Sequence, residues 1–265
     1  MANTPYIIAV ANQKGGVAKT TSVVSLAGAL AKRELEILVV DLDAQANLSL
    51  ALGTDPSKLR GSIADVLLNS ATLQSVSRGT SIPGLDLVPS NYEMELAERF
   101  LPLRQNHECI LREALNGRFT PSAYDYILLD CPPSIGVVTL NALNAAHFLL
   151  IPTQAEYFSA HGLRAMMAAI RRVRSQNNPG LIYRILITMH DRRNRIHRNL
   201  SEQIRSTFGE GIFQTVIEID TKLRESSVAG LPITHYNSQS RSSLQYDALA
   251  QELIQYAKEK KPHQA

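Results

Sequence analysis

The sequence predicts an α/β protein with a doubly wound, mostly parallel sheet and helices on both of its faces. Two observations support this prediction. Short runs of β-branched and other apolar residues alternate along the chain with segments of helical periodicity. Most of these runs are apolar throughout, which is typical of parallel strands that are covered on both faces. The alternation therefore indicates repeated strand–helix–strand units.

The expected elements follow one another without a break. Strands are predicted at 7–10, 36–41, 85–89, 124–130, 147–154, 183–189 and 212–217. Helical segments are predicted at about 19–31, 63–68, 91–101, 106–116, 160–175, 199–208 and 241–258. Since neither a linker nor an internal repeat separates them, we expect a single domain over residues 1–265, with a disordered tail from about residue 259.

Composition limits the classes of function. An apolar fraction of 45% suffices for a sizeable core, and the net charge of only +3 means that any surface for nucleic acid must be local. The two cysteines, Cys109 and Cys131, have no metal-binding spacing and suggest a reducing compartment. Neither a signal peptide nor an apolar run of about 18 residues is found, so we expect a soluble cytoplasmic protein.

The first predicted strand leads into a glycine-containing loop and then a helix. This arrangement forms a phosphate cradle, because backbone N–H groups converge there and the helix dipole adds positive potential. Lys19 would add a full charge for terminal phosphates, and the Thr20 hydroxyl lies where a nucleotide-bound Mg²⁺ needs a ligand. The expected nucleotide-binding residues are Lys14, Gly15, Gly16, Val17, Ala18, Lys19, Thr20 and Thr21.

The loop departs from the standard phosphate-loop pattern at two positions, where Gln13 and Ala18 replace glycines. An alanine at position 18 is acceptable in the right-handed helical region and costly if φ is positive. A glycine turn that binds no ligand is the alternative interpretation.

The run from Lys14 to Thr20, Lys-Gly-Gly-Val-Ala-Lys-Thr, resembles the deviant Walker A box KGGxGK[ST] of the ParA/MinD family of ATPases. The resemblance extends from about residue 6 to 257 and fits the short ParA type, which lacks an N-terminal helix-turn-helix. It implies a P-loop NTPase fold, ATP and Mg²⁺ as cofactors, and slow hydrolysis. It also implies a homodimer that encloses ATP, with Lys14 of each protomer reaching the other's phosphates and acting in catalysis beside Lys19.

Carboxylates follow two predicted strands. Asp43-x-Gln-x-Asn47 resembles the first switch of the family, in which this aspartate orients the attacking water, and Asp41 would bear on the magnesium shell. Asp130 ends an apolar strand as a Walker B aspartate does and would hold Mg²⁺ through a water. The residues after it, Cys131-Pro-Pro-Ser134, resemble the second switch. Helix capping is the alternative role for Asp41 and Asp43.

A basic cluster lies past the strand predicted at 183–189. Arg192, Arg193, Arg195 and Arg198 fall within seven residues, and relatives use basic residues at the positions of Arg193 and Lys222 to bind DNA without sequence preference. With Arg224, these residues are the predicted DNA site, since arginine and lysine bind phosphates without reading bases. A solvated surface is the alternative.

Two further segments depart from the family. Relatives read IPRNVRLxEAP where this chain has residues 217–227, so Glu218-Ile219 replaces a Pro-Arg pair near the adenine, and Glu218 and Asp220 are the remaining candidate contacts. The tail after Lys258 lacks the large apolar residues of the membrane-binding MinD branch. We therefore expect no membrane attachment.

The predicted function is that of a Mg²⁺-dependent ATPase that binds double-stranded DNA nonspecifically and positions a cargo on the nucleoid. The cargo could be a plasmid, a chromosome or a protein assembly such as a carboxysome, linked by an adaptor or ParB-like protein that stimulates hydrolysis. Two alternatives remain open. One is a nucleotide-dependent dimerisation switch with negligible hydrolysis, and the other is a metabolic P-loop enzyme of the dethiobiotin-synthetase kind.

Overall fold

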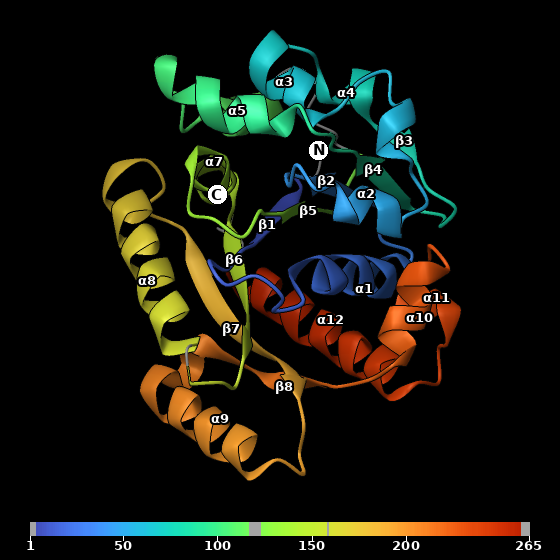
Figure 1. Ribbon diagram of the computed structural model, residues 1–265, viewed down its shortest axis with the longest axis vertical. Coiled ribbons are helices and arrows are strands. Elements are labelled where there is room, and N and C mark those ends of the chain that lie inside the picture. Colours follow the sequence, from blue (N-terminus) through green and yellow to red (C-terminus); the bar gives the residue numbers. More distant parts are fainter. Residues whose placement is uncertain (1–3, 117–122, 158, 261–265) are drawn as a thin grey trace.

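The computed structural model describes residues 4–116, 123–157 and 159–260. Its centre is an eight-stranded sheet in the order β3-β4-β2-β5-β1-β6-β7-β8 (Figure 1). The strands are β1 Tyr6–Val10, β2 Ile37–Asp41, β3 Arg78–Gly79, β4 Leu85–Val88, β5 Tyr126–Asp130, β6 Phe148–Gln154, β7 Ile182–His190 and β8 Ile212–Glu218. All described pairings are parallel except that of the short edge strand β3 with β4. The predicted fold class is confirmed.

Helices connect the strands. They are α1 Lys19–Ala31, α2 Asn47–Ala51, α3 Ile63–Asn69, α4 Leu73–Val76, α5 Met94–Phe100, α6 Ile110–Asn116, α7 Val137–Ala145, α8 Ser159–Gln176, α9 Arg195–Phe208, α10 Lys222–Val228, α11 Ile233–Tyr236 and α12 Arg241–Lys260. Within the described residues, no helix has the length and apolar character needed to cross a bilayer.

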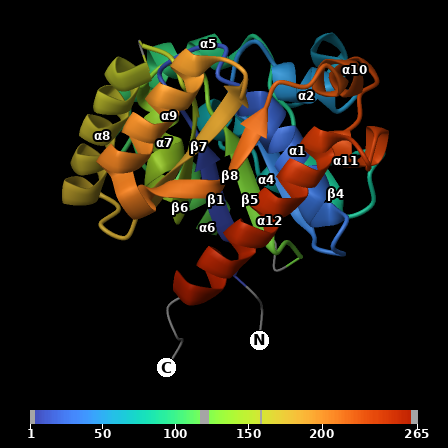
Figure 2. The same cartoon turned by 90° about the horizontal axis from the view of Figure 1, so that it is seen from below.

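Two hydrophobic cores lie on opposite faces of the sheet, because successive strand residues point to opposite sides. In β1, Ile7 and Ala9 belong to one core, which α3 to α8 complete. Tyr6, Ile8 and Val10 belong to the other, which α1 and α12 cover, as Figure 2 shows. Both faces are thus buried at the centre of the sheet, which explains why β1, β2 and β5 are apolar along nearly all of their length.

The structure differs from the sequence prediction at some helix boundaries and in several short elements. The helix predicted at 199–208 begins four residues earlier, because the Asn194 side chain accepts a hydrogen bond from the Ile196 amide (2.9 Å) and caps it there. Helices α2, α4, α7, α10 and α11 and the strand β3 were not predicted. α12 extends to Lys260, and the rest of the predicted tail, 261–265, lies outside the described residues.

The carboxyl ends of the parallel strands meet at one edge of the sheet, where open α/β sheets bind their ligands. β1 lies between β5 and β6, with Val10 opposite Asp130 and Leu150. The glycine-containing loop after β1 therefore emerges between the loops that follow β5 and β6. The register places most of the predicted site residues at this edge.

Candidate nucleotide-binding site

The loop between β1 and α1 is held by its own Asn12 and by side chains from the strands β6 and β7. The Asn12 side-chain amide donates to the Pro152 carbonyl (2.8 Å), and its oxygen accepts from the Lys14 amide (3.1 Å). The Gln154 amide donates to the Gly16 carbonyl (3.3 Å), and the Thr188 hydroxyl donates to the Val17 carbonyl (3.0 Å). These bonds hold the loop in one conformation before any ligand is present.

Ala18 has φ 64° and ψ 36°, which places it in the left-handed region directly before α1. The sequence analysis made this alanine costly under that condition, since its Cβ crowds the following carbonyl. Gly16, two residues earlier, has φ 72° and meets the same requirement without strain. The family's glycine at position 18 therefore has a conformational reason, and this chain stores strain there.

Lys19 lies at the start of α1, and its side chain folds back over the loop. Its ammonium donates to the Lys14 carbonyl (3.1 Å), and the residue is only 8% exposed. Burial lowers the pKa of Lys19, while the nearby carboxylates of Asp130 and Asp43 act in the opposite direction. Among the described residues, no carboxylate lies in salt-bridge contact with this ammonium, which is therefore available to a terminal phosphate.

Asp130 ends β5 beneath this loop and is fully buried. One carboxylate oxygen accepts a hydrogen bond from the Thr20 hydroxyl (2.6 Å), and the other has no partner within the described part of the chain. Burial, reinforced by the charge of Asp41, raises the pKa of Asp130 well above its ordinary value. A buried carboxylate with a free acceptor beside a hydroxyl fits Mg²⁺, which takes hard oxygen ligands and keeps several waters.

Asp41 pairs with Asp130 in the register of β2 and β5. One of its oxygens accepts from the Ser49 amide and hydroxyl (2.9 and 2.7 Å), and the other from the Asp43 amide (3.1 Å). Burial raises the pKa of Asp41 to about 6, although the bonds from Ser49 act against this. Asp41 therefore anchors the switch backbone and α2, as the capping alternative foresaw, and its place in the magnesium shell stays a prediction.

Asp43 is half-buried and faces the same region. Its carboxylate accepts from the Gln45 amide (3.0 Å), which shapes the turn that leads into α2. It follows Asp41, which lies opposite Asp130 in the register of β2 and β5, so Asp43 lies at the same edge of the sheet as the phosphate loop. The structure thus brings the predicted water-orienting carboxylate to the phosphate loop.

Lys14 points away from the cradle that Lys19 occupies. Its ammonium forms an ion pair with Glu156 (2.5 Å) and a hydrogen bond with the Gln154 side-chain oxygen (3.3 Å). The side chain is 29% exposed, and that of Glu156 is 45% exposed. In this single chain the second lysine of the loop is therefore held by the segment after β6, at the surface.

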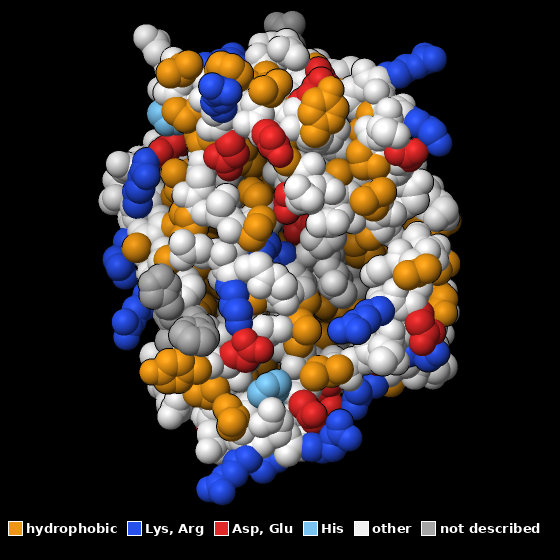
Figure 3. Space-filling view, in the orientation of Figure 1, with side chains coloured by type: hydrophobic (Ala, Val, Ile, Leu, Met, Phe, Trp, Pro, Cys, Tyr) orange, Lys and Arg blue, Asp and Glu red, His pale blue; other side chains and the backbone are white. Residues whose placement is uncertain are grey.

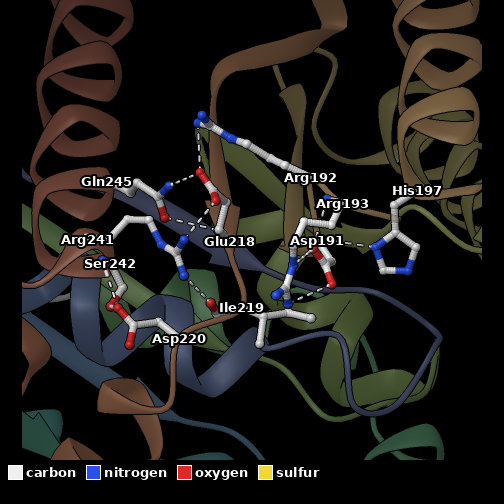
Figure 4. A network of polar contacts seen from close by, with 10 residues as sticks. All are labelled: Asp191, Arg192, Arg193, His197, Glu218, Ile219, Asp220, Arg241, Ser242 and Gln245. Atoms are coloured by element: carbon white, nitrogen blue, oxygen red, sulfur yellow. Dashed lines mark hydrogen bonds and ion pairs between the residues drawn. The ribbon is translucent and has the colours of Figure 1, made fainter. Parts of the chain in front are cut away.

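The two candidate adenine contacts are both engaged within the protein. Glu218, at the end of β8, forms ion pairs with Arg192 (2.7 Å) and Arg241 (3.1 Å) and accepts from Gln245 (2.9 Å), as Figure 4 shows. Asp220 accepts from the Ser242 hydroxyl (2.7 Å), and the serine's amide donates to the same oxygen. Their contact with a base stays a prediction.

The six predicted DNA-binding residues lie in two segments, which follow the carboxyl ends of the neighbouring strands β7 and β8. Arg193 is paired with Asp191 (3.2 Å), and Lys222 is paired with Glu225 (2.7 Å). Arg195 and Arg198 lie on the first turn of α9, where Arg198 donates to the Arg192 carbonyl (2.6 Å). Arg224 lies on α10, beside Lys222. These residues are exposed or partly exposed, and whether they bind DNA stays a prediction.

Sequence analysis did not identify the residues that position the loop. Asn12 follows β1, Gln154 ends β6, and Thr188 lies near the end of β7. Ser49 lies in α2 and donates to Asp41. Their position at strand ends was visible in the sequence, but which strands are neighbours was not. The contact of Glu156 with Lys14 was not predicted either.

Comparison with known proteins identifies relatives over nearly the whole chain. Residues 5–183 match a family model described as an AAA domain. The chain is 36% identical over 254 residues to the chromosome partitioning protein ParA of Caulobacter vibrioides, covering 96% of this chain and 95% of that protein. It is 38% identical over 245 residues to the chromosome-partitioning ATPase Soj of Treponema pallidum, covering 92% and 94%.

Solved structures share the fold. A cobyrinic acid a,c-diamide synthase from Mycobacterium smegmatis, solved with an ATP analogue and magnesium, superposes with a TM-score of 0.86 at 32% identity, over 97% of each chain. The ATP complex of a McdA variant from Cyanothece superposes with a TM-score of 0.84 at 17% identity, over 95% of this chain and 97% of that one. The second likeness concerns the fold alone.

We predict that Ala18→Gly raises the free energy of unfolding by about 0.5–1 kcal/mol, because glycine adopts the left-handed region without strain. Denaturant unfolding of the nucleotide-free protein measures it. Ala46, also left-handed (φ 52°) before α2, should respond in the same direction. Ala114→Gly inside the helix α6 should instead cost about 1 kcal/mol. A loss of stability in Ala18→Gly would contradict the strain argument.

A second prediction concerns Asp130. Asp130→Asn should stabilise the nucleotide-free protein at neutral pH by about 1–3 kcal/mol, because it removes a buried charge and keeps an acceptor for Thr20. In the unfolded chain Asp130 releases its proton near pH 3.8, whereas in the folded protein the raised pKa keeps it protonated to higher pH. The stability of the wild type therefore falls as the pH rises from 3.8 to the pKa of the folded state. The advantage of the variant should therefore shrink in acid. Unfolding curves at several pH values test this, and an unstabilised variant contradicts it.

Proposed function

Because this chain belongs to the ParA/MinD family of P-loop ATPases, we propose that it is a partition ATPase that binds ATP with Mg²⁺ and hydrolyses it slowly. The single observation that carries this proposal is the buried Asp130 carboxylate, with one free oxygen, bound to Thr20 beneath the loop from Lys14 to Lys19. The M. smegmatis neighbour, whose structure holds an ATP analogue and magnesium, supports the choice of cofactors.

Each residue of the site then has a task. The loop amides and Lys19 would bind the phosphates, and Thr20 and Asp130 would hold Mg²⁺, which neutralises phosphate charge. Asp41 holds the backbone of the switch through Ser49 and the Asp43 amide. Asp43 would accept a hydrogen bond from the water that attacks, and so orient it. The chain's contribution to hydrolysis is thus positioning and charge.

We also propose that ATP joins two protomers. Lys19 already supplies the cation that a one-subunit phosphate loop needs, so Lys14 is surplus within the chain. Its pairing with the half-exposed Glu156 is a surface contact worth about 0–1 kcal/mol, which a phosphate could replace. Lys14 would then leave Glu156 and reach the partner's nucleotide, which makes assembly dependent on ATP.

DNA binding and a cargo complete the proposal. The segments with Arg192 to Arg198 and with Lys222 and Arg224 would contact phosphates, and the two protomers together would double their number. The carboxylates paired with Arg193 and Lys222 are partly exposed, so their attraction is weak and phosphates can displace them. A ParB-like protein or other adaptor would link the dimer to its cargo and stimulate hydrolysis.

A second candidate function is ATP-dependent amide formation, because one solved neighbour at 32% identity is a cobyrinic acid a,c-diamide synthase. The relatives at 36–38% identity, matched over nearly their full length, are partition proteins, which favours the first proposal. Turnover assays separate the two. ATP consumption that rises with DNA supports partition, and consumption that needs cobyrinic acid and an amide donor supports synthesis.

We expect Asp43→Ala to bind ATP and Mg²⁺ normally and to lose turnover by at least about tenfold, because it removes water orientation and not binding. Phosphate release and nucleotide titration measure the two properties separately. The wild type should be slow alone and faster with DNA and a partner. Hydrolysis by the variant at the wild-type rate would exclude Asp43 from this role.

Lys14→Ala should bind ATP and remain monomeric, since it lacks the cation that crosses to the partner. Glu156→Gln is the matched variant, because it releases Lys14 from its ion pair and should dimerise at lower ATP concentration. Sedimentation velocity with and without ATP gives the result. If Lys14→Ala forms the same ATP-dependent dimer as the wild type, Lys14 does not reach a partner's nucleotide.

Binding to DNA should need ATP, ignore sequence and weaken sharply with salt, each phosphate contact contributing about 0.9 to the logarithmic slope. Replacing Arg193 and Lys222 together by glutamate should abolish it and leave nucleotide binding intact. Mobility shifts on two unrelated duplexes, with ATP or ADP at two salt concentrations, provide the test. Strong binding with ADP, or preference for one duplex, would assign the basic residues another role.

A further inference from the structure

The helix α9 carries an apolar stripe that is exposed at its first residue, Ile196, and only partly buried along the rest of its length. Ile196, Leu200, Ile204 and Phe208 recur every four residues and so lie on one side of the helix. Within α9 only Ser201 is buried, and Ile196 is 65% exposed. Ile204 and Phe208 already pack in part against the core. Because burying such a side chain fully is worth about 1.5–3 kcal/mol, further burial of the stripe would still be favourable, most of all at Ile196.

A groove of about 700 Å³ separates this stripe from α8. Its apolar lining consists chiefly of Leu163 and Met167 from α8 and of Leu200, Ile204 and Phe208 from α9. Glu156 and Tyr157 line it as well. In Figure 3, apolar side chains are visible where α8 and α9 approach each other, and basic side chains follow the edge over α8. An apolar groove between two helices fits an inserted amphipathic helix.

Two of the three charged side chains that line the groove are arginines without an ion pair to another described residue. Arg164 and Arg171 line it from α8, one heptad apart on the same side of that helix, and both are exposed. Among the described residues neither forms an ion pair or hydrogen bond. The acid that lines the groove, Glu156, already binds Lys14. A matching occupant must therefore combine apolar residues with carboxylates.

We propose that the groove between α8 and α9 docks an amphipathic helical segment of a partner protein, with apolar residues at three- and four-residue spacing and an acidic edge that pairs with Arg164 and Arg171. DNA fits less well, because phosphates gain nothing from Met167, Leu200 or Ile204. A second copy of this chain fits less well too, since a two-fold contact would place the same arginines opposite each other. The proposal does not rest on the ATPase function.

Selection from a random library of about 16-residue peptides, with the nucleotide-free wild type as bait, tests the proposal; this length spans about 24 Å as a helix. The enriched peptides should be acidic and amphipathic. Synthetic copies should bind the wild type about tenfold more tightly than the double variant Arg164→Glu and Arg171→Glu, since two exposed ion pairs are lost. Peptides with their acids changed to lysine should prefer that double variant.

Control variants distinguish groove contacts from general effects. The double variant Arg60→Glu and Arg99→Glu makes the same charge change at exposed positions away from the groove. It should bind the peptides as tightly as the wild type does. Ile204→Ser should not bind the peptides, because it removes part of the apolar stripe. If that variant is unstable, the double variant of Arg164 and Arg171 still tests the proposal, since it changes only exposed residues. Enrichment of neutral or basic peptides, or equal binding to the Arg164 and Arg171 double variant, would overturn the proposal.

Two further outcomes would show that the groove binds something other than a partner protein. A dimer that forms without nucleotide and dissociates in Ile204→Ser, seen by sedimentation velocity, would assign the groove to a second copy. Loss of DNA retention by Ile204→Ser, a change that alters no charge, would assign it to nucleic acid. Either result overturns a protein partner.

Discussion

The site depends on one buried carboxylate. The register of β5 between β1 and β2 places Asp130 beneath the loop, where the Thr20 hydroxyl bonds only one of its oxygens and no described cation lies in salt-bridge contact. Desolvation and the neighbouring charge of Asp41 make this arrangement unfavourable in the free protein. A divalent cation at the free oxygen would reverse that cost. Under the proposed function, the charge that destabilises the nucleotide-free fold would favour binding of Mg²⁺ together with its nucleotide.

The phosphate loop is held from its flanks and not by its own sequence alone. Gln154 at the end of β6 and Thr188 in β7 bond carbonyl groups of the loop, which leaves its N–H groups to point elsewhere. Ala18 has a left-handed conformation in the loop that these bonds hold. Because the surrounding bonds determine the loop conformation, the chain can tolerate an alanine where glycine is favourable, at a cost in stability.

The sequence was sufficient to predict structural features that depend on residues close together in the chain. Periodicity predicted the seven parallel strands, and the spacing of Lys14, Lys19 and Thr20 placed them on a loop that opens a helix, as the structure confirms. It was insufficient for features that depend on which strands are neighbours. Neither the contact of Lys14 with Glu156 nor the pairing of Arg192 with Glu218 could be read from separations of 142 and 26 residues. The early start of α9 depended on a cap at Asn194 that periodicity does not detect.

Half of the cations predicted to meet ligands form ion pairs with acids of the same chain, and the burial of each acid indicates how strong its pair is. Asp191, Glu156 and Glu225 are 28%, 45% and 40% exposed, so the pairs they form with Arg193, Lys14 and Lys222 are weak and exchangeable. Glu218 is only 6% exposed and binds two arginines, so removing Arg192 would leave a buried charge partly uncompensated. Arg192 is therefore structural first, and Arg193 and Lys222 are the members of the basic segments that a phosphate can recruit at little cost.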